Sequence, residues 1–432
     1  MKIGVVGIWH LGEIVAAGLA TIGHEVIGID KDAAVIEKLR AGIPPLSEPG
    51  LAETLRHPQI GPRLTWTNDP ERLSDCEAIF LTADTPVGDN DTADVRLLFD
   101  YVTWMAPHLR PAVVFVVMSQ VPVGTTHALV KALTAGRPGL DCTAVYVPEN
   151  LQLGNALRGF FHPDRLVIGA DEARAVVQIE RILSPLACAR QMMSIVSAEM
   201  TKHALNAFLA TSLSFIYNIA DACEAVGADV TDVSQALRSD PRIGPAAYLD
   251  TSLGFSGGTL MRDLTALQSV GQATGKTLPV IEGVLNTNRT RRRRIMERLE
   301  QLSGQPLSAL HVGMLGLTYK PGTPTLRRSM AMELLSMLRA AGVTVTAYDP
   351  LSSPEEYREA TGQTLAVDAY EMARGCQAII MVTAWPEFAN LDWLRLKSVM
   401  APPYIFYDTR NFLMDKEPLI RAAGFTYAGV GR

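Results

Sequence analysis

The sequence predicts an α/β protein with two Rossmann-like, doubly wound parallel-sheet domains joined by a helical section that contains a long central helix. Three observations support this fold class. The first 30 residues have the order strand, glycine-rich turn, helix, strand; short apolar runs alternate with helical patterns near both ends of the chain; and a long stretch with few helix breakers lies between them. The expected domains are residues 1–196, 197–303 and 304–432.

The N-terminal domain is predicted strand by strand. An apolar run at residues 3–6, a glycine turn, a helix through Ala20 and an apolar run at residues 25–29 that leads into Asp30 form one strand-helix-strand unit. Helical patterns separate several of the later apolar runs, so we expect a parallel sheet covered by helices on both faces. The later strands are expected at residues 78–82, 112–118, 144–147 and 166–169.

The middle of the chain is expected to be helical. Residues 198–226 carry apolar side chains at helical spacing and end before Gly227, which predicts one long helix. Helical patterns continue at residues 230–237 and 264–302, and such a section between two sheet domains is a candidate dimer surface. A second α/β unit is predicted from strands at residues 310–315, 343–348, 378–383 and 404–407.

Composition excludes nucleic acid as the main partner. The chain has 432 residues, enough for two or three domains, with 48% hydrophobic residues, 19% charged residues and a formal net charge of −6. This balance lacks the basic excess of a nucleic-acid-binding protein. The run of arginines at residues 291–294 is interpreted as a solvated basic face near a helix end, in preference to a phosphate or partner patch.

Cysteine usage and hydropathy indicate the compartment. The five cysteines are scattered without paired or CxxC spacing, so neither a disulfide framework nor a metal site is expected. Glycines and polar residues interrupt the N-terminal apolar stretch, unlike a signal peptide, and no apolar run is long enough to span a membrane. We therefore expect a cytoplasmic protein that binds no membrane.

The first turn, residues 7–12 (GIWHLG), predicts a dinucleotide site. It follows a strand and opens a helix, and Asp30 ends the next strand about 20 residues later. A carboxylate at that place hydrogen-bonds the ribose 2′-hydroxyl and repels a 2′-phosphate, which favours NAD over NADP. Gly7, Leu11, Gly12 and Asp30 are therefore candidate cofactor-binding residues.

Trp9 departs from the dinucleotide pattern. It occupies the middle glycine position, where a missing side chain lets the backbone approach the pyrophosphate. The indole must therefore point away or force the diphosphate outward, and the alternative to cofactor binding is a purely structural turn. His10 could donate a hydrogen bond to a phosphate, although a single histidine in a turn is more often only solvated. Trp9 and His10 are kept as candidate cofactor contacts.

One glycine-rich stretch carries a family resemblance. Residues 254–263 (GFSGGTLMRD) resemble the loop GFGGSCFPKD of the UDP-glucose/GDP-mannose dehydrogenases, which oxidise a sugar alcohol twice through a cysteine thioester. Other stretches similar to this family follow in the same order across nearly the whole chain. They are residues 85–86 (TP), 91–94 (DTAD), 119–125 (SQVPVGT), 148–151 (PENL), 161–165 (FHPDR), 198–208 (AEMTKHALNAF), 240–244 (DPRIG), 316–321 (GLTYKP) and 408–411 (DTRN).

The resemblance implies an N-terminal NAD domain, a central helix at a dimer core and a C-terminal domain that holds the nucleotide of a nucleotide sugar. The family's catalytic lysine and asparagine match Lys202 and Asn206, and its aspartate that orders a catalytic water matches Asp263. Glu149 matches the first acidic residue of the family's PEFLREG motif. Arg242 matches an arginine that reaches the neighbouring subunit's substrate in relatives. The other implied cofactor or substrate positions are Thr85, Ser119, Asn150, Leu151, Gly257, Lys320 and Arg410.

The residue types fit these roles. Lys202 and Asn206 are one helical turn apart and could meet the same substrate oxygen, with the lysine as base and the amide stabilising the developing charge. The alternative for Lys202 is an ion pair with Glu199 on a solvated face. Asp263 could instead cap a helix, and Glu149 could be a solvated loop acid at its strand end.

Three positions depart from the two-step mechanism. Thr259 replaces the cysteine, Leu153 replaces the second glutamate of PEFLREG, and Gln120 replaces a threonine. A hydroxyl without an adjacent base is a far poorer nucleophile than a cysteine. The expected reaction is therefore a single two-electron oxidation of a secondary alcohol to a ketone, as at C6 of a GDP-linked octose in antibiotic biosynthesis.

Two other functions stay open at this point. One is a UDP-sugar 6-dehydrogenase that stops at the aldehyde or passes it slowly through its hydrate. The other is a non-catalytic nucleotide-sugar binder, in which Trp9 and Thr259 would be signs that the enzymatic activity has been lost. The retained Lys202, Asn206 and Asp263 argue against decay. In each case the ligand is expected to be a GDP- or UDP-linked sugar.

Overall fold

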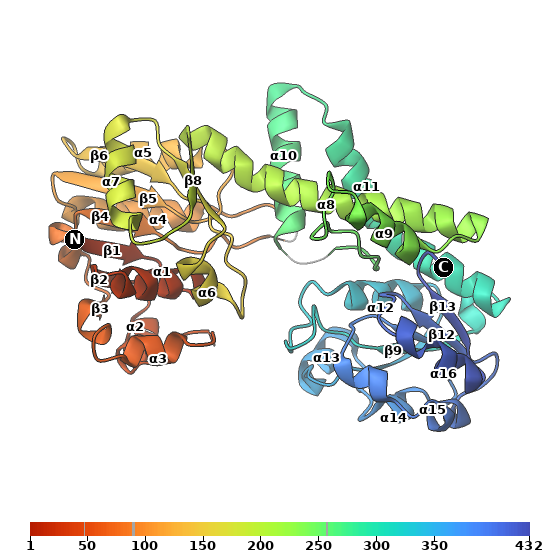
Figure 1. Cartoon of the computed structure of the whole chain (residues 1–432). Helices are drawn as coiled ribbons and strands as arrows, with labels where there is room; N and C mark the ends of the chain where they lie inside the picture. The colour runs from red at the N-terminus through yellow and green to blue at the C-terminus, as the bar shows by residue number, and fades with distance from the viewer. Residues whose placement is uncertain (47, 89–90, 256–257) are drawn as a thin grey trace. The chain divides into compact units, whose positions relative to one another are not determined.

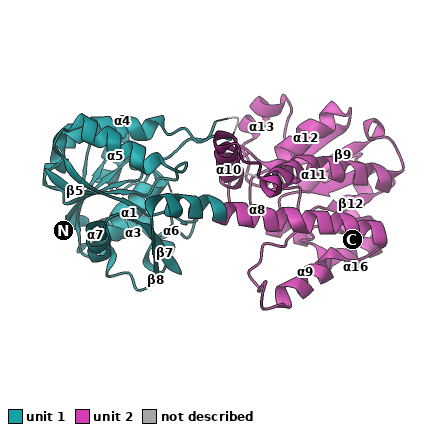
Figure 2. Ribbon diagram, turned by 90° about the horizontal axis from the view of Figure 1, so that it is seen from above, with its two compact units in different colours: residues 1–204 teal, residues 205–432 magenta. Residues whose placement is uncertain are grey.

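The computed structural model describes residues 1–46, 48–88, 91–255 and 258–432. The chain groups into two compact units, Met1–Ala204 and Leu205–Arg432, which Figure 2 shows in different colours. Each unit contains one sheet flanked by helices, which confirms the two-sheet α/β fold class. The boundary between the units falls inside one helix, and the division at residues 196/197 and 303/304 stays a prediction.

Unit 1 is built on an eight-stranded sheet in the order β3-β2-β1-β4-β5-β6-β7-β8 (Figure 1). Strands β1 to β6 run parallel, but β7 pairs with β6 in the antiparallel direction. The expectation of a wholly parallel sheet is wrong there, because the segment between β6 and β7 carries only a six-residue helix instead of a full crossover. The strands are Lys2–Val6, Glu25–Ile29, Leu64–Thr67, Ala78–Leu81, Ala112–Val117, Asp141–Tyr146, Arg165–Gly169 and Ala189–Met193.

Helices cover both faces of this sheet, as the alternation of patterns predicted. Along β1, Ile3 and Val5 pack into the core on the side of α1, whereas Val6 packs into the core on the side of α4 and α5. The helices of unit 1 are α1 (His10–Thr21), α2 (Ala33–Arg40), α3 (Leu51–Arg56), α4 (Arg96–Met105), α5 (Thr125–Gly136), α6 (Ala156–Phe161) and α7 (Ala173–Leu183).

The long central helix is α8, Ile195–Val226, and it extends from unit 1 into unit 2 (Figure 2). It begins three residues before the expected start and ends at the expected residue. Gly227, with φ +75°, terminates it in a left-handed conformation that a side chain would strain. One continuous helix therefore carries both Lys202 and Asn206.

Unit 2 contains a five-stranded parallel sheet in the order β10-β9-β11-β12-β13. The helical sequence expected at residues 264–302 forms two helices: α10 ends before Gly275, and Pro279 opens α11. The strands are His311–Leu315, Thr344–Tyr348, Ala378–Met381, Ile405–Asp408 and Thr426–Gly429 for β9 to β13. The helices are α9 to α16, at Val230–Ser239, Leu260–Thr274, Pro279–Ser303, Met330–Ala340, Pro354–Thr361, Ala369–Met372, Trp393–Val399 and Glu417–Ala422.

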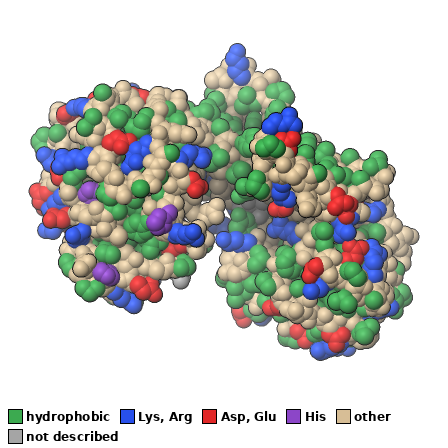
Figure 3. Space-filling model, in the orientation of Figure 1, with side chains coloured by type: hydrophobic (Ala, Val, Ile, Leu, Met, Phe, Trp, Pro, Cys, Tyr) green, Lys and Arg blue, Asp and Glu red, His purple; other side chains and the backbone are tan. Residues whose placement is uncertain are grey.

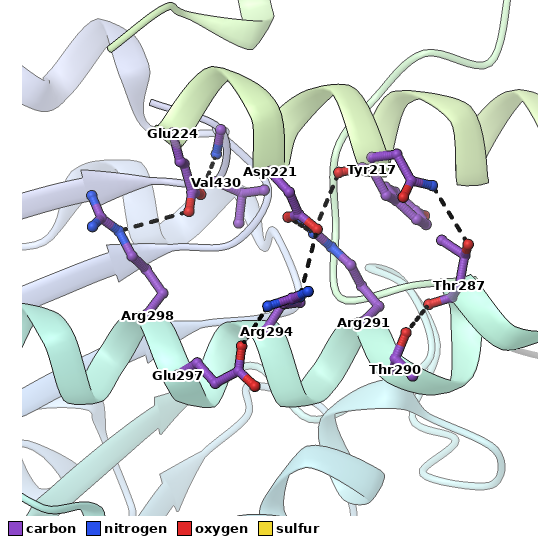
Figure 4. Close-up of polar contacts among 12 residues, drawn as sticks. Tyr217, Asp221, Glu224, Thr287, Thr290, Arg291, Arg294, Glu297, Arg298 and Val430 are labelled. Atoms are coloured by element: carbon purple, nitrogen blue, oxygen red, sulfur yellow. Dashed lines mark hydrogen bonds and ion pairs between the residues drawn. The ribbon is translucent and has the colours of Figure 1, made fainter. Parts of the chain in front are cut away.

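The arginine run at residues 291–294 lies in the middle of α11, beside α8 (Figure 4). Arg291 is buried against Asp221 of α8, and its Nε donates to the Ser252 carbonyl at 3.2 Å. Arg292 is buried too and pairs with Glu333 at 3.1 Å. The interpretation as a solvated face is therefore wrong for these two, because one side of α11 packs on other elements of unit 2 and only the following two arginines reach solvent.

The surface of each unit mixes charge types. On the face seen in Figure 3, lysine and arginine side chains are interspersed with acidic and apolar ones in both units. Among the described residues, no helix is both long enough and apolar enough to cross a membrane.

Candidate active site

The first turn of unit 1 requires glycine at two positions. Gly7 has φ +88°, and a Cβ atom there would lie 2.4 Å from the Ala83 side chain. A Cβ atom at Gly12 would lie 2.3 Å from the Gly7 carbonyl oxygen, so the helix α1 packs directly on the end of β1. The N-terminus of α1 therefore opens at the carboxyl end of the sheet, where its free N–H groups can bind an anion. Leu11 lies partly buried in the same turn, against the core beneath.

Trp9 occupies the middle position of this turn in an extended conformation, with φ −122° and ψ −158°. Its side chain is 45% exposed, so the indole lies toward solvent and not inside the turn. Its carbonyl accepts the Glu13 N–H at 2.9 Å as the first bond of α1. The turn thus keeps its backbone path although the middle residue is not glycine.

Asp30 stands at the end of β2 and is buried. One carboxylate oxygen accepts the Ile8 N–H at 2.6 Å and the other accepts the Asp32 N–H at 2.9 Å. The carboxylate therefore fixes the turn and lies at the carboxyl edge of the sheet, where the ribose contact is expected.

His10 is not simply solvated. Its Nε2 lies 3.1 Å from Glu48, a buried carboxylate that also accepts the N–H groups of Gly154 at 2.9 Å and Ala156 at 2.7 Å. Burial opposes the charge on Glu48, but hydrogen bonds from Gly154, His10 and Ala156 together lower its pKa. His10 and Glu48 thus tie the first turn to the loop after β6. Sequence reasoning missed Glu48, which belongs to no motif and lies 38 residues from its partner.

Glu13 is a second buried carboxyl that sequence reasoning missed. It is fully buried in the first turn of α1, and neither of its oxygens hydrogen-bonds to a residue in the described part of the chain. Burial raises the pKa of Glu13 to about 8; the charge of Glu48 adds to the rise, and the nearby Leu46 backbone amide opposes it. The signal that could have found it is a charged residue on an otherwise apolar helix face behind the turn.

Thr85 and Ser119 hold the loops at the ends of β4 and β5. The Thr85 hydroxyl donates to the Gln120 carbonyl at 2.8 Å, and the Ser119 hydroxyl donates to the Ala83 carbonyl at 2.6 Å. Both are buried at the carboxyl edge of the sheet. Gln120 is buried beside them, so the position that departs from the family pattern lies in the same loop.

Lys202 lies at the start of α8 against the loop that follows β6. Only 7% of its side chain is exposed, and its Nζ donates to the Glu149 carbonyl at 2.5 Å and to Asn150 Oδ1 at 3.1 Å. The Glu149 carboxylate lies 3.8 Å from the same nitrogen, and its other oxygen accepts the Leu151 N–H at 2.8 Å. The structure thus brings four of the expected site residues together within unit 1.

The alternative ion pair between Lys202 and Glu199 is wrong. Glu199 is fully buried, and its carboxylate accepts the N–H groups of Gly124 at 2.5 Å and Thr126 at 2.8 Å. It satisfies the N-terminus of α5 and turns away from the lysine.

Asn206 and Asp263 meet within unit 2. The Asn206 amide donates to the Asp263 carboxylate, and both side chains are buried. Asp263 lies in the first turn of α10, whereas Thr259 occupies the capping position, so the alternative role of Asp263 as the helix cap is wrong. Thr259 is exposed and makes no side-chain capping bond. Gly257, expected to contact substrate, lies outside the described residues.

A pocket opens at the carboxyl ends of β9, β11 and β12 in unit 2. Its lining includes Thr318, Tyr319, Ser329, Thr383 and Arg410. The Arg410 side chain is oriented by a bond from its Nε to the Val382 carbonyl at 3.3 Å. The Ser329 hydroxyl donates to the Leu317 carbonyl and the Thr383 hydroxyl to the Thr318 carbonyl, so these two fix the loops of the pocket. A guanidinium at the carboxyl edge of a parallel sheet suits the phosphates of a nucleotide.

Two expected contact residues lie elsewhere on unit 2. Lys320 is exposed and follows Tyr319, a residue of the pocket. The Arg242 side chain is 87% exposed and makes a two-armed bond to Asp240, at 3.0 and 2.7 Å. The Asp240 carboxylate therefore fixes the direction of an exposed guanidinium.

Comparison with known proteins decides the family. Residues 1–187 match the NAD binding domain of the UDP-glucose/GDP-mannose dehydrogenase family, residues 196–290 match its central domain and residues 313–415 match its UDP binding domain. The chain belongs to this family. It is an NAD-dependent oxidoreductase that acts on a CH–OH group of a nucleotide sugar.

Individual relatives cover the whole chain of this dehydrogenase. It is 34% identical to the UDP-glucose 6-dehydrogenase TuaD of Bacillus subtilis (strain 168), over 100% of this chain and 93% of that protein. It is 33% identical to a UDP-glucose 6-dehydrogenase of Rhizobium meliloti (strain 1021), over 100% of both chains. Its structure resembles that of a UDP-glucose dehydrogenase from the archaeon Pyrobaculum islandicum, with a TM-score of 0.86, 30% identity and coverage of 100% and 97%.

The residues of the first turn fit NAD. Gly7 and Gly12 leave space that a Cβ atom would fill, the N-terminus of α1 suits the pyrophosphate, and the Asp30 carboxylate suits a ribose diol. Bound NAD supplies the hydride acceptor for the oxidation. The dehydrogenase's own residues have to place the substrate and take up its hydroxyl proton.

Trp9→Gly is expected to keep the affinity for NAD or to increase it. The indole lies toward solvent, so its removal costs no contact within the turn and gives the pyrophosphate the closer approach that glycine allows. Titration calorimetry with NAD measures the change, and NADP is the control, because Asp30 is unchanged and should keep NADP weak in both proteins. Loss of NAD binding in the variant would show that the indole contacts the cofactor.

Proposed function

We propose that this dehydrogenase removes one pair of electrons from its nucleotide sugar and then releases the product. The oxidised carbon is a secondary alcohol, C6 of a GDP-linked octose in the biosynthesis of lincosamide antibiotics, and the product is a ketone. The observation that carries the proposal is Thr259, which stands where the family's GFGGSCFPKD loop has its cysteine.

The missing sulfur stops the reaction after one oxidation. A second hydride can leave an aldehyde carbon only after a nucleophile has made that carbon tetrahedral, and a cysteine is partly ionised and intrinsically nucleophilic at neutral pH. Thr259 has an ordinary hydroxyl on an exposed helix start, with no side-chain capping bond there. Leu153, in place of the second glutamate of PEFLREG, removes a carboxylate that hydrolysis of a thioester would use. A ketone product needs neither group, because it has no hydrogen left to give.

The residues for the first oxidation are all retained. In the proposed step the Lys202 amine takes the proton of the substrate hydroxyl, the C–H bond gives its hydride to NAD, and a C=O bond forms. The Asn206 amide, held by Asp263, stabilises the charge that develops on the substrate oxygen. Glu149 fixes Lys202 through its carbonyl and its carboxylate.

The nucleotide is proposed to bind in the pocket of unit 2. Arg410 would contact its phosphates from the pocket lining, and the exposed Lys320, two residues after Thr318 of the lining, would contact them from outside it. By the family resemblance, Asn150, Leu151 and Gly257 are proposed to contact the sugar. We expect GDP as the nucleotide because the proposed octose is GDP-linked.

The second candidate is a UDP-sugar 6-dehydrogenase that stops at the aldehyde or passes it slowly. It is favoured by the UDP binding domain match and by relatives that are UDP-glucose 6-dehydrogenases. A non-catalytic binder is disfavoured, since the Lys202–Glu149 and Asn206–Asp263 contacts are both intact.

A panel of nucleotide sugars distinguishes these functions. Each UDP- or GDP-linked sugar is mixed with NAD, NADH formation is followed by absorbance, and the product is analysed by mass spectrometry. The proposal expects the fastest turnover with a GDP sugar whose C6 is a secondary alcohol. Turnover of UDP-glucose alone would support the second candidate, and tight binding without turnover of any sugar would support the binder.

The homodimer is proposed to form along α8. Phe208 and Phe215 are 70% and 49% exposed and lie two helical turns apart on one face. Large apolar residues aligned in this way on a soluble protein mark a contact surface. The exposed Arg242 is proposed as the side chain that reaches the neighbouring subunit's substrate. All five cysteines are free, which suits the proposed cytoplasmic location.

The double variant Phe208→Asp with Phe215→Asp is expected to be monomeric. Each buried phenyl contributes about 2 kcal/mol to such a contact, and carboxylates in its place repel. Analytical ultracentrifugation measures the mass, with Leu394→Asp as control, because Leu394 is 70% exposed on α15, away from this face. An unchanged dimer, or a wild type that is monomeric at micromolar concentration, contradicts the proposal.

A further inference from the structure

Asn150 has the only side-chain amide that contacts Lys202 in the described residues of unit 1. Its Oδ1 lies 3.1 Å from Nζ, while the Glu149 carbonyl lies 2.5 Å from Nζ on the same loop. A lysine nitrogen offers hydrogens to its neighbours, so the atom of Asn150 that faces it is the oxygen. With two of its positions taken by these acceptors, the lysine nitrogen has one position left for a further partner.

The amide of Asn150 also carries two N–H donors. Asn150 is exposed, whereas Lys202 is nearly buried, and no residue in the described ranges accepts a hydrogen bond from Asn150 Nδ2. The two N–H donors of this amide belong to the same side chain whose oxygen contacts Lys202. They are therefore available to a group attached next to the carbon that Lys202 serves.

The family motif has a phenylalanine at this position. Residues 148–151 read PENL where the motif begins PEFL, so a phenyl ring is replaced by a smaller, polar amide. A ring there would fill the space beside the lysine and offer no hydrogen bond. The exchange both opens this space and places donors in it.

A primary alcohol and a secondary alcohol differ in what the oxidised carbon carries beside its hydroxyl. A primary C6 carries two hydrogens besides its hydroxyl and its bond to C5, so it needs no further room at this position. A secondary C6 carries a further carbon with its own hydroxyls, which need both room and hydrogen-bond partners, because a buried hydroxyl without a partner is costly.

We propose that Asn150 is a specificity-determining residue that receives the polar substituent on the oxidised carbon, with its amino group donating to a hydroxyl of that substituent. The inference rests on the proposed function and names the feature of the substrate that the site selects. The contact of its oxygen with Lys202 positions the base at the same time.

The test compares two GDP sugars with each variant: GDP-mannose, with a primary C6 hydroxyl, and a GDP-octose that carries hydroxyls on C7 and C8. The measured quantity is the ratio of kcat/KM for the octose to kcat/KM for GDP-mannose. Asn150→Phe is expected to lower this ratio by about a hundredfold because the ring refills the space. Asn150→Ala keeps the space but loses the donor, and should lower the ratio by about tenfold.

Asn155→Phe is the matched control. It places the same ring on an exposed asparagine of the same loop, whose side chain does not cap α6, and should leave the ratio unchanged. NAD affinity of each variant, measured by calorimetry, shows that the first unit is folded.

Equal losses of kcat for both sugars in Asn150→Phe and Asn150→Ala would show that Asn150 acts only through Lys202, and would overturn the proposal. An unchanged ratio would overturn it as well. If the wild type oxidises GDP-mannose twice, the one-step function fails, yet a ratio that falls in both variants still supports the role of Asn150. The two failures are therefore distinguishable.

Discussion

Lys202→Met is expected to lower kcat by about a hundredfold to ten-thousandfold, the usual contribution of a positioned general base. Methionine keeps the length and the burial of the side chain but cannot take up a proton. The loop that faces Lys202 loses only its bonds to Nζ, and the first turn is untouched. NAD affinity should therefore change by no more than about twofold, well below a tenfold effect.

Steady-state kinetics with the preferred nucleotide sugar measure kcat, and calorimetry measures NAD binding. Lys38→Met is the control, since Lys38 is exposed on α2 and contacts none of the site residues named above. A Lys202→Met enzyme that keeps more than about a tenth of kcat would be incompatible with a general base at this position.

Glu13→Gln is expected to make the stability of the protein less dependent on pH. The folded-state pKa of Glu13 is raised from 4.5 to about 8, so the folded state disfavours its charged form. The protonated Glu13 carboxyl therefore makes its full contribution to the stability of the folded state below pH 4.5. This contribution declines as the pH rises and is lost above pH 8. Over this window the wild type loses about a factor of ten in its folding equilibrium per pH unit, on the order of 5 kcal/mol in total.

Urea unfolding of both proteins at pH 5.5, 7 and 8.5 measures this effect as the difference between their unfolding free energies. The difference should move steadily in favour of Glu13→Gln as the pH rises, while other titrating groups cancel because they are common to both proteins. Glu53→Gln, a change at an exposed residue of α3, should show a constant difference. A constant difference for Glu13→Gln too would mean that the carboxyl titrates normally.

The fold was accessible from local patterns. A few consecutive residues determine each apolar strand, the glycine turn at residues 7–12 and the helix end at Gly227. Periodicity and turn chemistry are therefore enough to predict these elements. The direction of β7 was not accessible in this way, because an apolar run has the same appearance in a parallel and an antiparallel pair.

Side-chain partners were harder to predict than elements. Arg291 was assigned to a solvated face because a run of like charges is usually solvated, whereas its partner Asp221 lies 70 residues away on another helix. Glu199 was offered as the partner of Lys202 because residues three apart on a helix are neighbours. Its carboxylate instead accepts hydrogen bonds from N–H groups at the N-terminus of α5, and only the tertiary structure shows that this helix end lies beside it.

In the candidate site, too, the residues were easier to predict than their contacts. Motif positions such as Lys202, Glu149 and Asp263 were identified by resemblance, and the structure brings Lys202 to Glu149 and Asn206 to Asp263. The residues Asn150, Lys202 and His10 lie in recognised stretches, but the contacts Asn150–Lys202 and His10–Glu48 were not predicted, since each joins residues far apart in the sequence whose pairing depends on the tertiary structure.

The one-step reaction is tested most directly by the amount of NADH formed per molecule of nucleotide sugar when a limiting amount of the sugar is consumed to completion. One NADH per sugar, with a product that has lost two hydrogens and gained no oxygen, is the predicted result. Two NADH per sugar, with a carboxylate product, would contradict it and would mean that the second oxidation proceeds without the sulfur that Thr259 replaces.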